Sequence, residues 1–250
     1  MTDNTETTKT PEISFDQAKA ILSVAYLFAA IDGKICDEEQ GQFRAIMKQL
    51  FGGRYADAEV MTYLEGVSEE ARKLMALRNF YTDDEDLVKA FAAKSATAVA
   101  TVVNDAYTLR CAFAIWISIC CADKDYSRIE RSAVKCIQKM VNPTSFFKEI
   151  KPPKSGAKVA GVAATAAAMI PGVGLLALPI AGALLVANAG QVGIGYNITD
   201  AFLADVEKRI RKIGEIHAKM EAADNVDIKQ NYKDMYDFEV ENFKEFLASK

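Results

Sequence analysis

The chain has 250 residues, of which 50% are hydrophobic and 26% are charged, a balance that is ordinary for a globular protein. Its net charge of −4 argues against nucleic-acid binding, for which an excess of lysine and arginine is typical. Five cysteines without a CxxC pair and a single histidine, His217, exclude a zinc site of ordinary spacing. The odd cysteine count and the lack of a secretory signal predict a reducing, cytoplasmic compartment.

The hydrophobic pattern is helical along the chain, and no stretch alternates long enough to predict a strand. Residues 1–13 are polar and rich in threonine, and we expect them to be disordered. Residues 14–145 form the predicted helical domain. Its first helix ends near Ile31, before Gly33, and its second ends at the stretch FGG. Further helices are predicted over 56–67, 69–80 and 85–101, so we expect an all-α fold.

The helix–turn–helix segment around Asp32 recurs 91 residues later. Asp32 and Glu39 in the first segment correspond to Asp123 and Glu130 in the second. Apolar positions on both sides also correspond, but any two amphipathic helices can be aligned in that way. A shared Asp-x6-Glu spacing across both turns is more specific, and it predicts that two related helix hairpins arose by internal duplication.

The motifs AAIDGKICDEE and CCADKDYSRIE resemble those of the tellurite-resistance TerB-like domains, and the resemblance covers residues 14–142. It implies a compact helical bundle with an acidic, metal-binding centre. It also implies a role in stress or defence systems that act near membranes. The second turn has Lys124 where the first has Gly33, so equal geometry at the two turns does not follow from the resemblance.

Two explanations of the turn acids stay open. Cys36 or Asp37, with Glu39 or Gln40 about three residues later, has the spacing of a capping box, and Ser127 with Glu130 has that spacing unambiguously. The aspartates lie at the C-terminal ends of apolar helices, where the helix dipole disfavours an acid. Each aspartate therefore needs a partner, such as free N–H groups of the next helix, a basic side chain or a cation.

In the cation explanation, the duplication brings all four acids around one hard divalent ion. Oxygen ligands alone select calcium, magnesium or manganese over zinc. The predicted metal ligands are Asp32, Glu39, Asp123 and Glu130.

Residues 159–199 form an uncharged block of 41 residues that is rich in alanine and glycine. A basic linker, residues 146–158, precedes the block, and a second basic cluster, residues 208–212, follows it. Because cytoplasmic flanks collect lysine and arginine, this symmetry favours a re-entrant membrane hairpin over a single crossing. The two limbs are short against a hydrocarbon core of about 30 Å, so a hairpin buried in protein or in an oligomer interface is the alternative.

Residues 200–250 predict two charged helices with apolar stripes. The first stripe includes Phe202 and Val206, and the second includes Tyr232, Met235, Phe238 or Glu239, Phe243, Phe246 and Leu247. Such stripes predict packing on the chain's own domain, with binding of a partner as the alternative.

The chain contains no motif for a nucleophile, a phosphate loop or a dinucleotide site, so we expect no enzyme, with a carboxylate-only metal hydrolase as the enzymatic alternative. The expected function is that of a TerB-like, cation-binding regulatory or adaptor protein tethered to the inner face of a membrane. Its partners are membrane lipid or a membrane protein. The alternative is a membrane-perturbing, pore-forming effector whose hairpin inserts and oligomerises under control of the helical domain.

Overall fold

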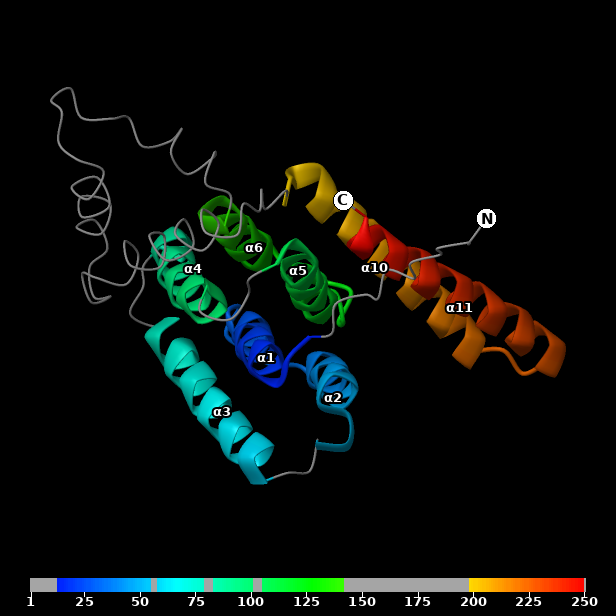
Figure 1. Ribbon diagram of the computed structural model, residues 1–250, viewed down its shortest axis with the longest axis horizontal. Coiled ribbons are helices and arrows are strands. Elements are labelled where there is room, and N and C mark those ends of the chain that lie inside the picture. The colour runs from blue at the N-terminus through cyan, green and yellow to red at the C-terminus, as the bar shows by residue number, and fades with distance from the viewer. Residues whose placement is uncertain (1–12, 55–57, 79–82, 101–104, 142–197, 250) are drawn as a thin grey trace, which may run out of the picture.

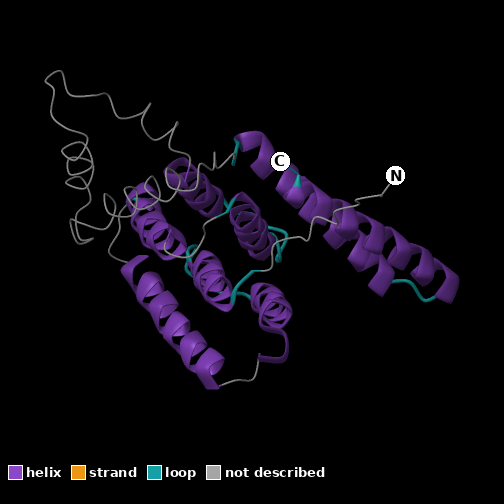
Figure 2. Cartoon of the chain, in the orientation of Figure 1, coloured by secondary structure: helices purple, strands orange, loops and turns teal. Residues whose placement is uncertain are grey.

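The computed structural model describes residues 13–54, 58–78, 83–100, 105–141 and 198–249, and this part of the chain contains helices and no strand (Figures 1 and 2). The all-α prediction is therefore confirmed. The elements are α1 (Phe15–Ala30), α2 (Asp37–Phe51), η1 (Gly52–Arg54), α3 (Ala58–Arg78), α4 (Asp84–Ala100), α5 (Ala106–Cys120), α6 (Arg128–Val141), α10 (Asp200–Glu221) and α11 (Val226–Ala248). The predictions for residues 1–12 and 142–197 lie outside the described residues.

Helix α1 lies at the centre of the bundle, where α2, α3, α4 and α5 pack around it (Figure 1). Its sequence, FDQAKAILSVAYLFAA, is apolar on most sides, and such a helix is stable only when other elements cover it. One polar contact fixes the pairing of α1 with α5. The buried indole N–H of Trp116 donates to the carbonyl of Ile21 at 3.0 Å.

Helix α3 is continuous from Ala58 to Arg78, whereas the sequence predicted two helices, 56–67 and 69–80. The predicted break near Ser68 is therefore wrong. Val60, Val67 and Ala71 are all buried, and their spacing of seven and four residues places them on one face of a single helix. Burial of that continuous face outweighs the local turn signal at Gly66–Ser68.

The two hairpins repeat at the level of the backbone. Helices α1 and α5 begin at residues 15 and 106, and α2 and α6 begin at residues 37 and 128, so both pairs keep the 91-residue offset. The N-caps of α1 and α5 repeat as well. Ser14 accepts from the backbone N–H of Gln17, and Asp105 accepts from that of Thr108. Local capping chemistry therefore sets equivalent helix starts in both halves.

The turns that follow α1 and α5 also share one geometry, in spite of the exchange of glycine for lysine. Gly33 has a φ of 95° and Lys124 has a φ of 71°, both in the left-handed region. Each N–H bonds to the carbonyl three residues earlier, at 3.1 Å from Gly33 to Ala30 and at 3.2 Å from Lys124 to Cys121. Lys124 is thus a residue with a Cβ at a position that favours glycine.

Helices α10 and α11 form an antiparallel pair whose far end projects beyond the bundle (Figure 1). The rings of Phe202 and Phe246 stack at 5.5 Å between centroids, and Lys212 pairs with Glu239 at 2.6 Å. Met235 and Phe238 are 50% and 65% exposed. The sequence left open whether Phe238 or Glu239 belongs to the stripe that faces α10, and the structure shows that Glu239 contacts α10. The prediction that Met235 belongs to this stripe is wrong, because its side chain is exposed.

The two left-handed turns predict opposite effects of substitution. We expect Gly33→Ala to destabilise the fold by about 1–2 kcal/mol, because alanine strains a left-handed backbone. The added Cβ would also lie 3.0 Å from Cδ of Arg78, whose guanidinium donates to the Ile31 carbonyl at 2.7 Å. Lys124→Gly should stabilise the fold by up to about 1 kcal/mol, because it relieves the same strain. Urea unfolding at neutral pH measures both changes.

The matched control is Gly41→Ala in α2, where nothing lies within 4 Å of the added Cβ. That substitution should stabilise the fold by about 0.5–1 kcal/mol, because alanine has the higher helix propensity. If Gly33→Ala behaved like Gly41→Ala, the strain assigned to the first turn would be wrong.

Candidate functional site

Glu39 and Glu130 act as the third residues of two equivalent capping boxes. Glu39 accepts from the N–H of Cys36 at 2.9 Å, and Glu130 accepts from the N–H of Ser127 at 2.7 Å. In return, the Cys36 sulfur and the Ser127 hydroxyl each accept from the glutamate N–H at 3.4 Å. The capping explanation of the two glutamates is thus borne out by their hydrogen bonds.

Asp32 and Asp123 each accept a hydrogen bond from the backbone two residues further along. Asp32 Oδ1 takes the N–H of Lys34 at 3.1 Å, and Asp123 Oδ1 takes that of Asp125 at 2.8 Å. These are Asx turns, which stabilise the loop itself. Each aspartate therefore has a loop N–H group as a partner, which was not among the three partners that the sequence left open.

The fold brings the acids of the two turns to one end of the bundle. The charges of Asp32 and Asp123 both act on the carboxyl of Glu39, and the charge of Glu39 acts on Glu130. Glu39 is 4% exposed and Glu130 is 3% exposed, while the aspartates are half-buried. The two equivalent turns thus form a buried pair of glutamates flanked by two more accessible aspartates.

Cys120, the last residue of α5, is fully buried, and its thiol lies close enough to the Glu130 carboxyl to act on the pKa of that group. The pKa of its thiol is raised, first by burial and then by the charge of Glu130. The sequence marked Cys120 only as an apolar position in the repeat. Its contact with Glu130 depends on how the α5–α6 turn closes, and no sequence signal marks it.

Burial dominates the electrostatics of the glutamates. Burial raises the pKa of Glu130 to about 7, against hydrogen bonds from Ser127 and Cys120 that lower it, and the charge of Glu39 raises it further. Burial likewise raises the pKa of Glu39, and the charges of Asp32 and Asp123 add to that effect, while the bonds to Cys36 oppose it. Both carboxyl groups therefore hold a proton more tightly than an exposed glutamate does.

Whether the four acids hold a divalent ion depends on how many of their oxygens converge on one point. Calcium, magnesium and manganese need several oxygens at about 2.0–2.6 Å from one point. Among the described residues, no group of three or more Asp, Glu, Cys or His side chains could hold an ion. One oxygen of each of the four acids already accepts from the backbone. The ion site formed by these acids stays a prediction of the sequence, tested below.

The second turn carries an ion-pair cluster that the sequence did not reveal. Arg131 binds Glu207 of α10 through two nitrogens, at 2.5 and 2.8 Å, and its guanidinium lies over the ring of Tyr126. Arg211 bonds to the same glutamate at 3.0 Å. These contacts join residues 76 positions apart and hold α10 against the second hairpin. Each partner by itself is an ordinary charge on a helix, so no local pattern indicates the pair.

Ile198 is the first residue that the structure describes after residues 142–197, and it is held by α6, the helix that carries Arg131. Ile198 is 1% exposed in the core, and its carbonyl accepts from the Gln138 amide at 3.0 Å. Gln138 lies in the last turn of α6. The two described ends of the chain around residues 142–197 are therefore held next to each other.

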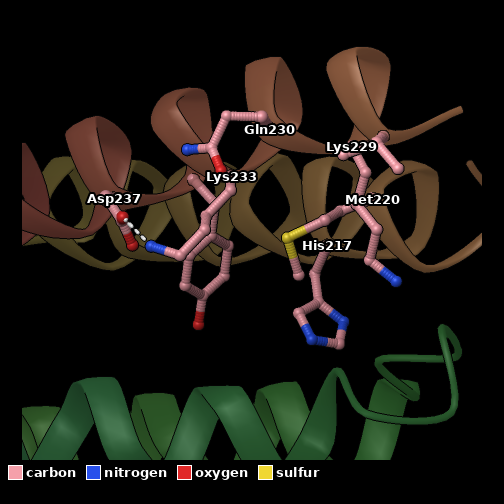
Figure 3. A pocket seen from close by; sticks show the side chains of 8 residues that line it. His217, Met220, Lys229, Gln230, Lys233 and Asp237 are labelled. Atoms are coloured by element: carbon pink, nitrogen blue, oxygen red, sulfur yellow. Dashed lines mark hydrogen bonds and ion pairs between the residues drawn. The ribbon is translucent and has the colours of Figure 1, made fainter.

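A separate hollow of about 460 Å³ lies between α10 and α11 at the projecting end (Figure 3). His217, Met220 and Tyr236 are among its lining residues, and the imidazole and phenol centroids are 5.6 Å apart. Its one carboxylate, Asp237, is paired with Lys233 at 2.6 Å. Because its lining groups are largely exposed, we assign this hollow no chemistry.

Comparison of the chain with protein-family models, with curated proteins and with solved structures gives no match. The resemblance to TerB-like domains therefore rests on the two turn motifs alone.

The raised pKa of Glu130 predicts a pH dependence of stability. A carboxyl whose pKa is higher in the folded chain stabilises the fold below its ordinary value of 4.5, and this contribution is lost as pH rises to about 7. Glu130→Gln keeps a capping-box side chain but cannot ionise. We expect it to match the wild type near pH 4.5 and to be more stable by about 1–3 kcal/mol at pH 8. Urea unfolding across this pH range measures the difference.

Asp37→Asn is the matched control, because Asp37 is an exposed acid in the first turn of α2. The control should keep the pH slope of the wild type between pH 4.5 and 7. If Glu130→Gln destabilised the fold equally at every pH, the fold would need the shape of the Glu130 side chain, and protonation of that carboxyl would have no effect on the free energy of unfolding.

The hydrogen bonds of Asp32 and Asp123 predict how the chain responds to divalent ions. Asparagine keeps the Asx-turn acceptor, so Asp32→Asn with Asp123→Asn should retain the wild-type Tm without ions. Since each aspartate already accepts from the backbone, we expect millimolar calcium, magnesium or manganese to leave the Tm of both proteins unchanged. A rise in Tm for the wild type alone, with matching heat in calorimetry, would establish the ion site.

Proposed function

We propose that this protein is a non-catalytic adaptor or regulatory module, held at a membrane by residues 159–197 of its uncharged block, with the helical domain on one side. The observation that carries the proposal is the anchoring of Ile198 and α10 on the second hairpin. The block is thereby a segment inserted between two elements that pack on one core.

A single crossing does not fit this anchoring. It would place α10 and α11 across the bilayer from α1–α6. Leu203 and Val206 of α10 are buried in the common core, and Arg110 of α5 bonds to the carbonyls of Leu247 and Ser249. Separating the two parts would expose these apolar surfaces and break the Arg131–Glu207 pair. A block that enters the membrane and returns on the same side keeps every contact.

The composition of the block supports the membrane as its surroundings. It has no charge over 41 residues, and lysines and arginines lie on both flanks, as expected for a segment with two cytoplasmic ends. Of the helices that the structure describes, none is long and apolar enough to cross a membrane.

The central test compares the full chain with a variant that lacks residues 159–197 and keeps Ile198. In a density gradient, we expect the full chain to float with liposomes that contain anionic lipid. The variant should stay at the bottom, with an unchanged helical circular-dichroism spectrum. A control variant that lacks residues 2–12 should float like the full chain, because the deletion leaves the block intact.

Three further measurements define the outcome. Epitope tags at the two ends should be digested together by protease outside sealed vesicles, whereas protection of one tag alone would mean that the block crosses.

A full chain that stays soluble and monomeric without detergent or lipid would contradict the membrane proposal. Release of an entrapped dye would indicate the pore-forming alternative, whereas flotation without release supports the adaptor.

A further inference from the structure

The 91-residue repeat allows one surface of the first hairpin to be compared with its counterpart in the second. Helices α1, α2 and α3 enclose an open groove of about 240 Å³. Its apolar lining is contributed by Tyr26, Phe43, Met47, Met61 and Leu64, with Arg44 at the rim. Met61 is 47% exposed there. Methionine-rich apolar grooves of this kind accept amphipathic helices.

The equivalent surface in the second hairpin is covered by a helix. Gln40 and Met47 of the groove correspond to Arg131 and Gln138. These two residues bond to Glu207 and to the Ile198 carbonyl, so they hold α10 and the chain two residues before it. In the second hairpin, this surface therefore binds a helix that presents apolar residues together with a carboxylate.

The outer face of α11 has that chemistry and is uncovered in the described chain. Ile228, Met235 and Phe238 are 50%, 50% and 65% exposed, and their spacing of seven and three residues places them in one stripe. Isolated exposed apolar residues are common, but a stripe of three on one helix face is the pattern of a helix that docks into a groove.

The charges at the two surfaces are complementary. Asp227, Asp234 and Glu241 are exposed and follow one another at seven-residue spacing, so they form a row beside the apolar stripe. In the described part of the chain, the guanidinium of Arg44 donates only to Gln40, at 3.3 Å. A carboxylate from this row would meet Arg44, which lies one helical turn after Gln40, the counterpart of Arg131.

We propose that the groove between α2 and α3 receives the outer face of α11 from a second copy of the chain, with Met235 and Phe238 seated in it and the acidic row facing Arg44. Because the groove and the stripe lie on different elements, two copies related by a two-fold axis make this contact twice. Without such an axis, the contact continues from copy to copy and forms a chain of copies. This contact uses described residues only and does not depend on the membrane proposal.

Site-specific photocross-linking of the full chain in lipid or detergent tests the contact. A benzophenone side chain at position 238, in chains mixed with ¹⁵N-labelled wild type, should give adducts between light and heavy chains. Mass spectrometry should place them on peptides that contain Met47 or Met61. The matched control carries the probe at Lys233, on another side of α11, and should give no adduct in the groove.

Charge reversal separates the contact from general association. Arg44→Glu in the labelled chain should lower the yield several-fold, and Asp234→Lys with Glu241→Lys in the probe chain should restore it. Each variant is compared at equal helicity and Tm. Adducts that lie outside the groove, adducts within one chain only, or no adduct at any protein concentration would overturn the proposal.

Discussion

The packing of α1 against α5 is the constraint on which the rest of the structure depends. Both helices are apolar on nearly every side, and neither is stable in water unless other helices cover it. The Trp116 indole, bonded to the Ile21 carbonyl in the core, fixes how the two helices face each other. The turns that follow them consequently meet at one end of the bundle, and all four conspicuous acids lie at these turns.

At that end, two physical requirements oppose each other. Helices α2 and α6 need acceptors for their first N–H groups, and glutamate at the third position supplies them. The same glutamates become buried close together, which disfavours their charged forms. The result is a pair of carboxyl groups with raised pKa values in a centre built from caps and Asx turns. Acids that resemble metal ligands in sequence can thus be explained by hydrogen bonds to the backbone.

The second hairpin differs from the first mainly in what covers it. Arg131 and Gln138 hold α10 in place, whereas their counterparts Gln40 and Met47 line an open groove. This asymmetry underlies both proposals. The anchored α10 keeps Ile198 beside Gln138, so the described chain before and after residues 142–197 meets at one place, and the open groove leaves a matching surface for a helix.

The sequence by itself determined the features that depend on neighbouring residues. Helix periodicity predicted the all-α fold, and spacing alone predicted the cap at Ser127 and the 91-residue repeat, whereas the choice of Cys36 over Asp37 as the first cap came from the structure. Only the tertiary structure decided the continuity of α3, the left-handed backbone at Lys124, the Arg131–Glu207 pair and the outward face of Met235 and Phe238. Capping and amphipathicity act over a few residues and leave a local pattern. Burial, ion pairing and strain depend on which distant segments meet, and no local pattern records that.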